Sequence, residues 1–179
     1  SKILDVLIDS VEDELTTDYA FFGHSMGAVL AFELARRLRK QDKPMPARLF
    51  LSGRRAPHLK GEFVRRHTLS RDRLLEWAVE IGGFPKELLA HPDMINFFVE
   101  PLAADMEALE NWQFKAEEPL LVPFSVFSGI DDPEVTWQQV VAWTELSALR
   151  CETKSFPGRH FYLKEEGFAI INEMVTALE

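Results

Sequence analysis

The sequence predicts an α/β fold, in which helices flank a mostly parallel sheet. Short apolar runs of strand type alternate with amphipathic helical runs, which is the order expected of such a sheet. The strand-type run at residues 47–52 is of continuous apolar type, as in strands that are covered on both faces. No repeat, low-complexity tract or linker divides the 179 residues. One domain is therefore expected over residues 1–179, with a core at 1–61 and 119–179 and a helical lid inserted at about 62–118.

Composition limits the classes of function. The net charge of −9 argues against nucleic-acid binding. The single cysteine excludes an internal disulfide and fits a reducing compartment. No apolar run approaches membrane-spanning length, and the first residues do not resemble a signal peptide. We therefore expect a soluble cytoplasmic protein that binds neither nucleic acid nor membrane.

The first third of the chain predicts helix, strand, helix and strand in turn. An amphipathic helix is expected over residues 1–15, because apolar residues recur there at spacings of three and four. The apolar run from Tyr19 leads as a strand into a tight turn at Ser25, and a helix with an inner face of alanine and leucine follows. After a proline-containing loop, residues 47–52 form the second strand.

The insertion shows helical patterns and no strand pattern. One helix is expected after a cap at Ser70, and another runs from Pro92 to about residue 112, which Pro101 should kink or divide. The apolar side chains of these helices either pack the insertion onto the sheet or line an apolar tunnel. The tunnel-lining candidates are Trp77, Phe97 and Phe98.

The last third predicts two further strands and two helices. Residues 122–128 and 150–156 are expected to be strands, and Cys151 in the second of them is interpreted as a buried structural thiol. Helices are expected at 135–146 and 161–179. The inward side chains of the first of these helices should be Val140, Val141 and Trp143.

The turn at Ser25 carries the pattern G-x-S-x-G between a strand and a helix, which is typical of a nucleophile elbow. Such a turn projects the serine hydroxyl into a cleft. Side chains at positions 23 and 27 would collide with neighbouring backbone, which explains glycine at both. The backbone N–H of Met26 opens the following helix and would point to an oxyanion formed at Ser25.

Two further loops, each after a predicted strand, carry Asp132 and His160. Because parallel strands bring their carboxyl ends to one edge of a sheet, we expect Ser25, Asp132 and His160 to converge. A serine needs a histidine to take its proton, and the histidine needs a carboxylate to orient it. The order Ser, Asp, His is that of the α/β-hydrolase fold.

Each partner has competitors. Asp131 is adjacent to Asp132, and it is interpreted as a solvated or capping residue. His24 lies inside the turn, and its side chain should point away from the cleft. The other three histidines do not follow a strand: His58, His67 and His91. No cluster has metal-ligand spacing and no glycine-rich phosphate loop is present, so neither a metal nor a cofactor is expected.

The chain resembles the type II (editing) thioesterases of nonribosomal peptide and polyketide synthesis, which are relatives of the medium-chain acyl thioesterases. The resemblance rests on residues 22–28 (FGHSMGA), 51–57 (LSGRRAP), 129–133 (GIDDP) and 156–161 (FPGRHF), and runs through nearly the whole chain. It implies an α/β-hydrolase fold with nucleophile Ser25, acid Asp132 and base His160.

Two departures from the family pattern stand out. Arg159 replaces the glycine that usually precedes the histidine, so it should narrow the cleft or contact a phosphate. The family also has earlier strands and a loop that supplies a second oxyanion N–H, and neither is found in this sequence. We therefore expect an N-terminally incomplete fold, with a missing N-terminal segment or a complementing chain as a partner.

The resemblance implies hydrolysis of acyl groups from the phosphopantetheine arm of acyl or peptidyl carrier proteins, through an acyl-enzyme at Ser25. The phosphopantetheine would belong to the substrate. A run of seven basic residues against two acidic ones between positions 54 and 73 would suit an acidic carrier or the phosphate of the arm, although it would equally suit a solvated face. Three alternatives stay open: a medium-chain acyl-carrier or acyl-CoA thioesterase, another esterase of this fold, and a carrier-binding module without activity.

Overall fold

Four parallel strands form the centre of the computed structural model, which describes residues 2–11, 14–15, 19–60 and 64–179. The strands follow one another in space in chain order: β1 (Phe21–His24), β2 (Leu49–Ser52), β3 (Phe124–Gly129) and β4 (Cys151–Phe156). In the register, Leu51 of β2 lies between Gly23 of β1 and Val126 of β3. The predicted α/β fold with a parallel sheet is confirmed for the described residues.

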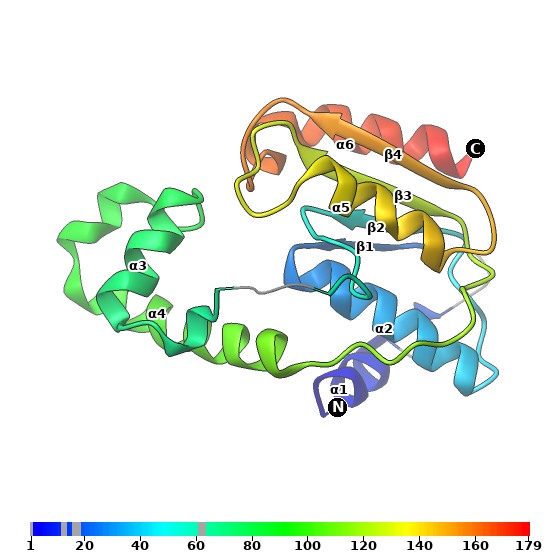
Figure 1. Ribbon diagram of the computed structural model, residues 1–179, viewed down its shortest axis with the longest axis horizontal. Helices are drawn as coiled ribbons and strands as arrows, with labels where there is room; N and C mark the ends of the chain where they lie inside the picture. The colour runs from blue at the N-terminus through cyan, green and yellow to red at the C-terminus, as the bar shows by residue number, and fades with distance from the viewer. Residues whose placement is uncertain (1, 12–13, 16–18, 61–63) are drawn as a thin grey trace.

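Helices cover both faces of this sheet (Figure 1). One face carries α2 (Met26–Lys40), α5 (Trp137–Val141) and the 3₁₀ helix η4 (Ala142–Leu146). The other face carries α6 (Leu163–Leu178), and α1 (Lys2–Val11) packs on the outer side of α2. The sheet is thus the middle layer, and its carboxyl ends point toward the insertion.

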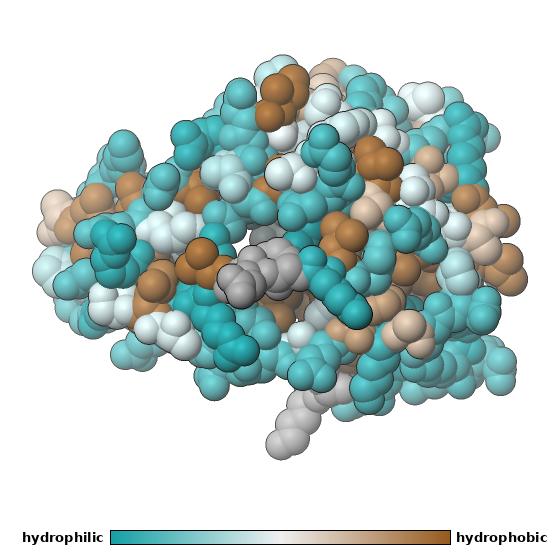
Figure 2. Space-filling model, viewed as in Figure 1, coloured by the Kyte–Doolittle hydropathy of each residue, from teal (hydrophilic) through white to brown (hydrophobic). Residues whose placement is uncertain are grey.

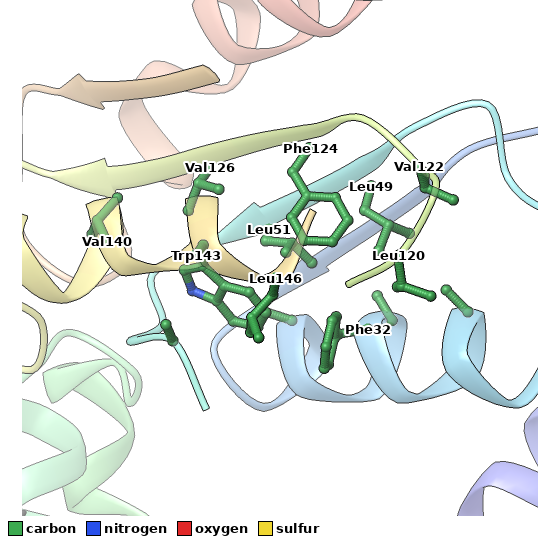
Figure 3. Close-up of a cluster of buried hydrophobic side chains, with 14 of the residues drawn as sticks. Phe32, Leu49, Leu51, Leu120, Val122, Phe124, Val126, Val140, Trp143 and Leu146 are labelled. Atoms are coloured by element: carbon green, nitrogen blue, oxygen red, sulfur yellow. The ribbon is translucent and has the colours of Figure 1, made fainter. Parts of the chain in front are cut away.

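The larger core lies between the sheet and α2, α5 and η4 (Figure 3). Leu49 and Leu51 of β2 face this layer, whereas Phe50 between them faces α6, as the alternation of a strand requires. The rings of Phe32 and Trp143 lie 5.3 Å apart, edge to face, and join α2 to η4. Trp143 is fully buried, and its Nε1 donates to the carbonyl of Arg54, just beyond β2.

The insertion, described over residues 64–118, consists of helices joined by turns up to residue 111, and residues 112–118 have no regular secondary structure. It comprises η2 (Arg66–Thr68), α3 (Arg71–Glu80), η3 (Lys86–Ala90) and α4 (Pro92–Asn111). Ser70 caps α3 as predicted, because its Oγ accepts from the backbone N–H of Arg73. Of the two outcomes predicted at Pro101, division is wrong, since α4 runs through it, and a kink stays a prediction. Pro101 and Phe97, one turn earlier, are exposed, so water can satisfy the carbonyl that proline leaves unpaired.

Several predicted boundaries differ from the structure. The first helix ends at Val11 rather than residue 15, and residues 1, 12–13 and 16–18 lie outside the described part. The helix predicted at 135–146 begins at Trp137, after a capping box at Thr136, and tightens into η4. Val141 is exposed rather than inward, because a helix turns by about 100° per residue and its neighbour Val140 faces the sheet.

Cys151, predicted as a buried structural thiol, is only half-buried at the start of edge strand β4. Burial still raises its pKa to about 11, which keeps the thiol protonated near neutral pH. None of the described helices has the length and apolar character needed to cross a membrane. On the face shown in Figure 2, exposed apolar side chains are scattered among polar ones.

Candidate active site

Ser25 occupies a sharp turn between β1 and α2. Its backbone has φ 54° and ψ −114°, a conformation that residues other than glycine rarely adopt. Its N–H donates to the carbonyl of Ser52 at 2.8 Å, which ties the turn to the end of β2. The serine therefore has the strained strand-to-helix geometry of a nucleophile elbow. Met26 begins α2, so its N–H belongs to the positive end of that helix.

The two glycines of the motif differ in how much space surrounds them. A Cβ on Gly23 would lie 2.1 Å from the carbonyl oxygen of Gly27, so β1 and α2 can approach this closely only with glycine at 23. A Cβ on Gly27 would meet nothing within 4 Å. The prediction that both positions exclude a side chain is therefore confirmed for Gly23 and wrong for Gly27, which faces open space.

Asp132 and His160 form a pair at the ends of β3 and β4. His160 Nδ1 lies 2.9 Å from Asp132 Oδ2, and the side chains are 4% and 0% exposed. The other carboxylate oxygen accepts from the backbone N–H of Glu134 at 2.8 Å. The carboxylate is thus held by two donors, and its neighbour Asp131 is exposed. These contacts leave Nε2 of His160 as the nitrogen available to another group.

Gly129 makes this convergence sterically feasible. A Cβ there would lie 2.3 Å from the carbonyl oxygen of Arg159, so the end of β3 passes directly beneath the loop that carries His160. The three predicted residues come from three different strand ends, as expected for a parallel sheet. Ser25 and His160 line the same cavity.

The cavity has a volume of about 780 Å³ and lies between the sheet edge and the insertion. Figure 2 shows the surface hollowed between these two parts. Its wall is mixed rather than purely apolar, because four arginines and two glutamates join the apolar groups. The lining residues include Arg54, Arg66, Trp77, Met106, Glu110 and Glu134.

The three tunnel candidates are separated by the structure. Trp77 lines the cavity, whereas Phe98 packs against Phe84 with ring centroids 4.7 Å apart. Phe97 is 80% exposed and lies on the outer side of α4. The apolar wall instead includes Met106, Leu109, Trp112 and Phe114. The helical period of α4 separates Met106 and Leu109 from Phe97, but the sequence does not say which face meets the cavity.

Glu134 joins the insertion to the loop that carries Asp132. Both of its carboxylate oxygens accept from Arg66 Nη2, at 2.8 and 2.7 Å, and Oε1 also accepts from Trp77 Nε1 at 3.0 Å. The Arg66 guanidinium lies over the Trp77 ring, 4.5 Å from its centroid. One residue of the acid loop therefore holds η2 and α3 of the insertion. Sequence analysis did not single out Glu134, and its only signal was its position two residues after Asp132.

The predicted basic run separates into two groups. Arg54, Arg55, Arg65 and Arg66 line the cavity. The other three basic residues are exposed: Lys60, and Arg71 and Arg73 on α3. Burial lowers the pKa of Arg54, and Glu134 nearby partly opposes that effect. Arg159 lines a separate groove with α3, of about 460 Å³, and is not among the residues that line the cavity with Ser25.

The competing histidines have other surroundings. His67 Nδ1 lies 2.5 Å from Glu110, and His58 Nε2 lies 3.3 Å from Glu145. His91 precedes α4 and is exposed. His24 is different: its ring packs on His160, with centroids 5.0 Å apart. It does not line the cavity with Ser25, as expected, but its contact with the candidate base was not predicted.

Known proteins with similar sequences include thioesterases and a protein of gramicidin S biosynthesis. The Thioesterase domain family matches residues 1–178. The gramicidin S biosynthesis protein GrsT of Aneurinibacillus migulanus is 31% identical over 177 residues, covering 99% of this chain and 69% of GrsT. Linear gramicidin dehydrogenase LgrE of Brevibacillus parabrevis is 34% identical, covering 93% of this chain and 64% of LgrE. The chain thus spans about two thirds of the length of these curated relatives.

Solved structures agree with the fold. The RedJ thioesterase from the prodiginine biosynthetic pathway of Streptomyces coelicolor is 35% identical, with a TM-score of 0.87, covering 95% of this chain and 69% of RedJ. The type II thioesterase BorB from the borrelidin biosynthetic cluster is 30% identical, with a TM-score of 0.87, covering 99% of this chain and 72% of BorB. These similarities extend over both the sheet and the insertion.

Proposed function

This chain belongs to the thioesterase family, and on that premise we propose that it hydrolyses acyl thioesters carried by the phosphopantetheine arm of carrier proteins, as an editing enzyme of nonribosomal peptide or polyketide synthesis. The observation that carries the proposal is the hydrogen-bonded Asp132–His160 pair. His160 lines the same cavity as Ser25, which lies in the turn between β1 and α2. The relatives RedJ and BorB, a thioesterase and a type II thioesterase of named biosynthetic pathways, support this substrate class.

The proposed mechanism uses one base and one nucleophile. His160 Nε2 takes the proton of the Ser25 hydroxyl as its oxygen attacks the thioester carbonyl. Asp132, fixed by the N–H of Glu134, orients the imidazole and stabilises its protonated form. The N–H of Met26 donates to the developing oxyanion. As the carbon–sulfur bond breaks, His160 protonates the departing thiolate, and the acyl group remains on Ser25.

Water completes the cycle. His160 takes a proton from a water molecule, whose oxygen attacks the acyl carbonyl. The bond between the acyl group and Ser25 Oγ then breaks, His160 returns the proton to Ser25, and a carboxylic acid is released. The thiol that leaves is the end of the phosphopantetheine arm, so phosphopantetheine is part of the substrate rather than a cofactor. The proposed location is the cytoplasm, where carrier-bound synthesis would supply such substrates.

The charge of the cavity supports a carrier-bound substrate. Arg54 lies in the same cavity as Ser25, and the arm carries a phosphodiester at its far end from the thiol. A guanidinium pairs well with phosphate oxygens. We therefore include an acidic carrier and its phosphorylated arm as the proposed partner. Acyl-pantetheine, which lacks the phosphate, should be hydrolysed with a higher KM than acyl-phosphopantetheine, and Arg54→Gln should remove that difference.

The direct test follows the acyl group on a loaded carrier protein by intact mass. The unchanged chain should remove the acyl group, and Ser25→Ala should not. Loss of the acyl group at the same rate with Ser25→Ala would overturn the mechanism. Hydrolysis of oxygen esters but not carrier thioesters would favour another esterase of this fold. Carrier binding without any hydrolysis would favour a binding module.

A further inference from the structure

His24 is a second imidazole directly behind the candidate base. Its ring centroid lies 5.0 Å from that of His160, with an interplanar angle of 47°. The same ring lies 5.4 Å from Phe161 and 6.1 Å from Tyr162, which follow His160 in the chain. His24 therefore contacts three consecutive residues of the loop that carries the base.

A polar chain fixes the orientation of the His24 ring. Its Nδ1 lies 2.9 Å from Ser52 Oγ, and that hydroxyl lies 2.6 Å from the Tyr162 hydroxyl. Ser52 and Tyr162 are both fully buried. Burial raises the pKa of Tyr162, so its hydroxyl stays a neutral donor or acceptor. The chain connects β1, β2 and the start of α6 behind the site.

The backbone beside His24 is shaped to admit the ring. Gly53 has φ +58°, and a Cβ there would lie 2.5 Å from His24 Cε1. Any residue with a side chain at 53 would displace the imidazole. This contact explains why glycine occupies position 53 in the S-G-R-R-A-P stretch, which the sequence alone did not explain.

The ring is also held in one charge state. Burial lowers the pKa of His24 to about 4, with His160 lowering it further and Asp132 acting in the opposite direction. The titratable groups that face it from the packed elements are His160, Asp132 and Tyr162. Because the His24 ring stays neutral, the proton taken from Ser25 in the proposed mechanism stays on His160.

We propose that His24 is a positioning residue: its ring, seated against Gly53 and bonded to Ser52, holds His160 in the orientation that faces Ser25 and excludes water from the rear of the imidazole. This inference rests on the proposed function for its kinetic readout only. Replacement by alanine would open space behind His160, so the base would sample other orientations and meet water.

The kinetic test compares three variants with the unchanged chain on an acyl-carrier substrate. His24→Ala should lower kcat by about 10- to 100-fold with little change in KM, since a misoriented base impairs chemistry rather than binding. Its pH–rate profile should have an acidic limb displaced to higher pH, because water behind the imidazole favours the charged form. His24→Phe keeps an aromatic ring in the seat and should recover part of kcat.

Ser52→Ala is the matched control, because it removes the hydrogen bond and leaves the ring. It should lower kcat less than His24→Ala. Equal kcat and an unmoved acidic limb in His24→Ala, in a variant that remains folded, would overturn the proposal. A general loss of kcat in all three variants with no displacement of the limb would assign His24 a merely structural role, which also contradicts it.

A second readout does not depend on thioester hydrolysis. In an NMR titration of the imidazole Cε1–H signals, the His24 signal should stay unchanged from pH 8 to about pH 5, as its low pKa requires. At fixed pH, the His160 ring signals should broaden or split in His24→Ala, because the ring then samples more than one orientation. Unchanged His160 signals would refute the positioning role even if no substrate were ever hydrolysed, whereas failure of the hydrolysis assay alone would refute only the proposed function.

Discussion

The structure leaves no space for a methyl group on Gly23, but it leaves space for one on Gly27, four residues later. The carbonyl of Gly27 would lie 2.1 Å from a Cβ at Gly23, whereas a Cβ at Gly27 would meet nothing within 4 Å. Two glycines of one motif therefore have unequal roles. Gly23 permits the close contact of β1 with α2, and Gly27 lies in the first turn of the helix.

These two glycines make a matched pair of substitutions. Gly23→Ala should destabilise the protein by about 3 kcal/mol or more, because backbone must move to relieve the overlap. Gly27→Ala should be neutral or stabilise by up to about 1 kcal/mol, because alanine favours a helix. Urea unfolding measures both. Comparable destabilisation by the two substitutions would contradict the steric difference.

His24 makes stability depend on pH. Its pKa of about 4 in the folded protein lies below the ordinary value of 6.5, so the unfolded chain binds the proton more readily between these values. Its neutral burial should reduce stability as pH falls from 6.5 toward 4, by at most roughly 3 kcal/mol. Urea midpoints at pH 7.5 and 4.5 should differ less in His24→Asn than in the unchanged chain. An unchanged difference would show that His24 does not contribute.

Among the elements, the insertion is attached at two places by carboxylates. Glu134 binds Arg66 and Trp77 at the cavity. Glu117 lies on the segment that returns from α4 to the sheet, and it binds α2. These attachments set where the helices of the insertion stand relative to the strand ends.

Glu134→Gln should loosen the insertion. The Arg66–Glu134 side chains are each 19% exposed, so loss of the negative charge leaves a poorly solvated guanidinium, and a destabilisation of about 1–3 kcal/mol is expected. Glu76→Gln is the matched control, because its partner Arg73 is 72% exposed and such pairs contribute little. Limited proteolysis should cut the insertion faster in Glu134→Gln only. Equal cutting rates would contradict the attachment.

Glu117 anchors the return segment to three basic residues of α2. Burial alone would raise its pKa, but hydrogen bonds from Lys40, Arg36 and Arg39 outweigh it and lower the pKa to about 2. The stabilisation is present above pH 4.5 and is lost as pH falls toward 2.

Glu117→Gln should therefore reduce the free energy of unfolding at pH 7 by about 1–2 kcal/mol, after allowance for partial exposure. The difference from the unchanged chain should shrink between pH 4.5 and pH 2. Glu118→Gln is the control, because Arg39 binds the backbone carbonyl of Glu118 and not its carboxylate. Equal effects of the two substitutions in urea unfolding would argue against the anchor.

For the molecule as a whole, the proposed acyl substrate has to fit the cavity between the sheet and the insertion. Its apolar wall comes from one face of α4 and the segment after it, including Met106 and Phe114. The outer face of α4, with Phe97, does not reach it. Cavity volume is therefore set by how the insertion is attached as much as by its composition.

Met106→Trp should shorten the preferred acyl chain. A larger ring on the cavity wall would exclude long acyl groups, and the ratio of kcat/KM for a long acyl thioester to that for acetyl should fall about tenfold or more. Phe97→Trp, on the exposed face, should leave the ratio unchanged. Competition between two acyl substrates in one reaction measures it. A change of similar size in Phe97→Trp would show that volume at Met106 is not the cause.

The sequence by itself determined the fold class, the strand order in the chain and the three candidate residues. Strand and helix periods are local properties, and the elbow motif requires a particular backbone whatever surrounds it. The succession of strand-end loops brought Ser25, Asp132 and His160 to one edge, because parallel strands share that edge. Their catalytic roles stay a prediction, as do the domain boundaries.

Only the tertiary structure decided which side chains meet across these elements. Glu134 contacts Arg66 and Trp77, and His24 contacts His160, across segments that are far apart in the chain, and no spacing in the sequence records such contacts. The open side of Gly27, the seat that Gly53 makes for His24, and the separation of Trp77 from Phe97 depend on how the layers pack. Steric room and burial are properties of space between segments, so they arise only when distant parts of the chain are brought together.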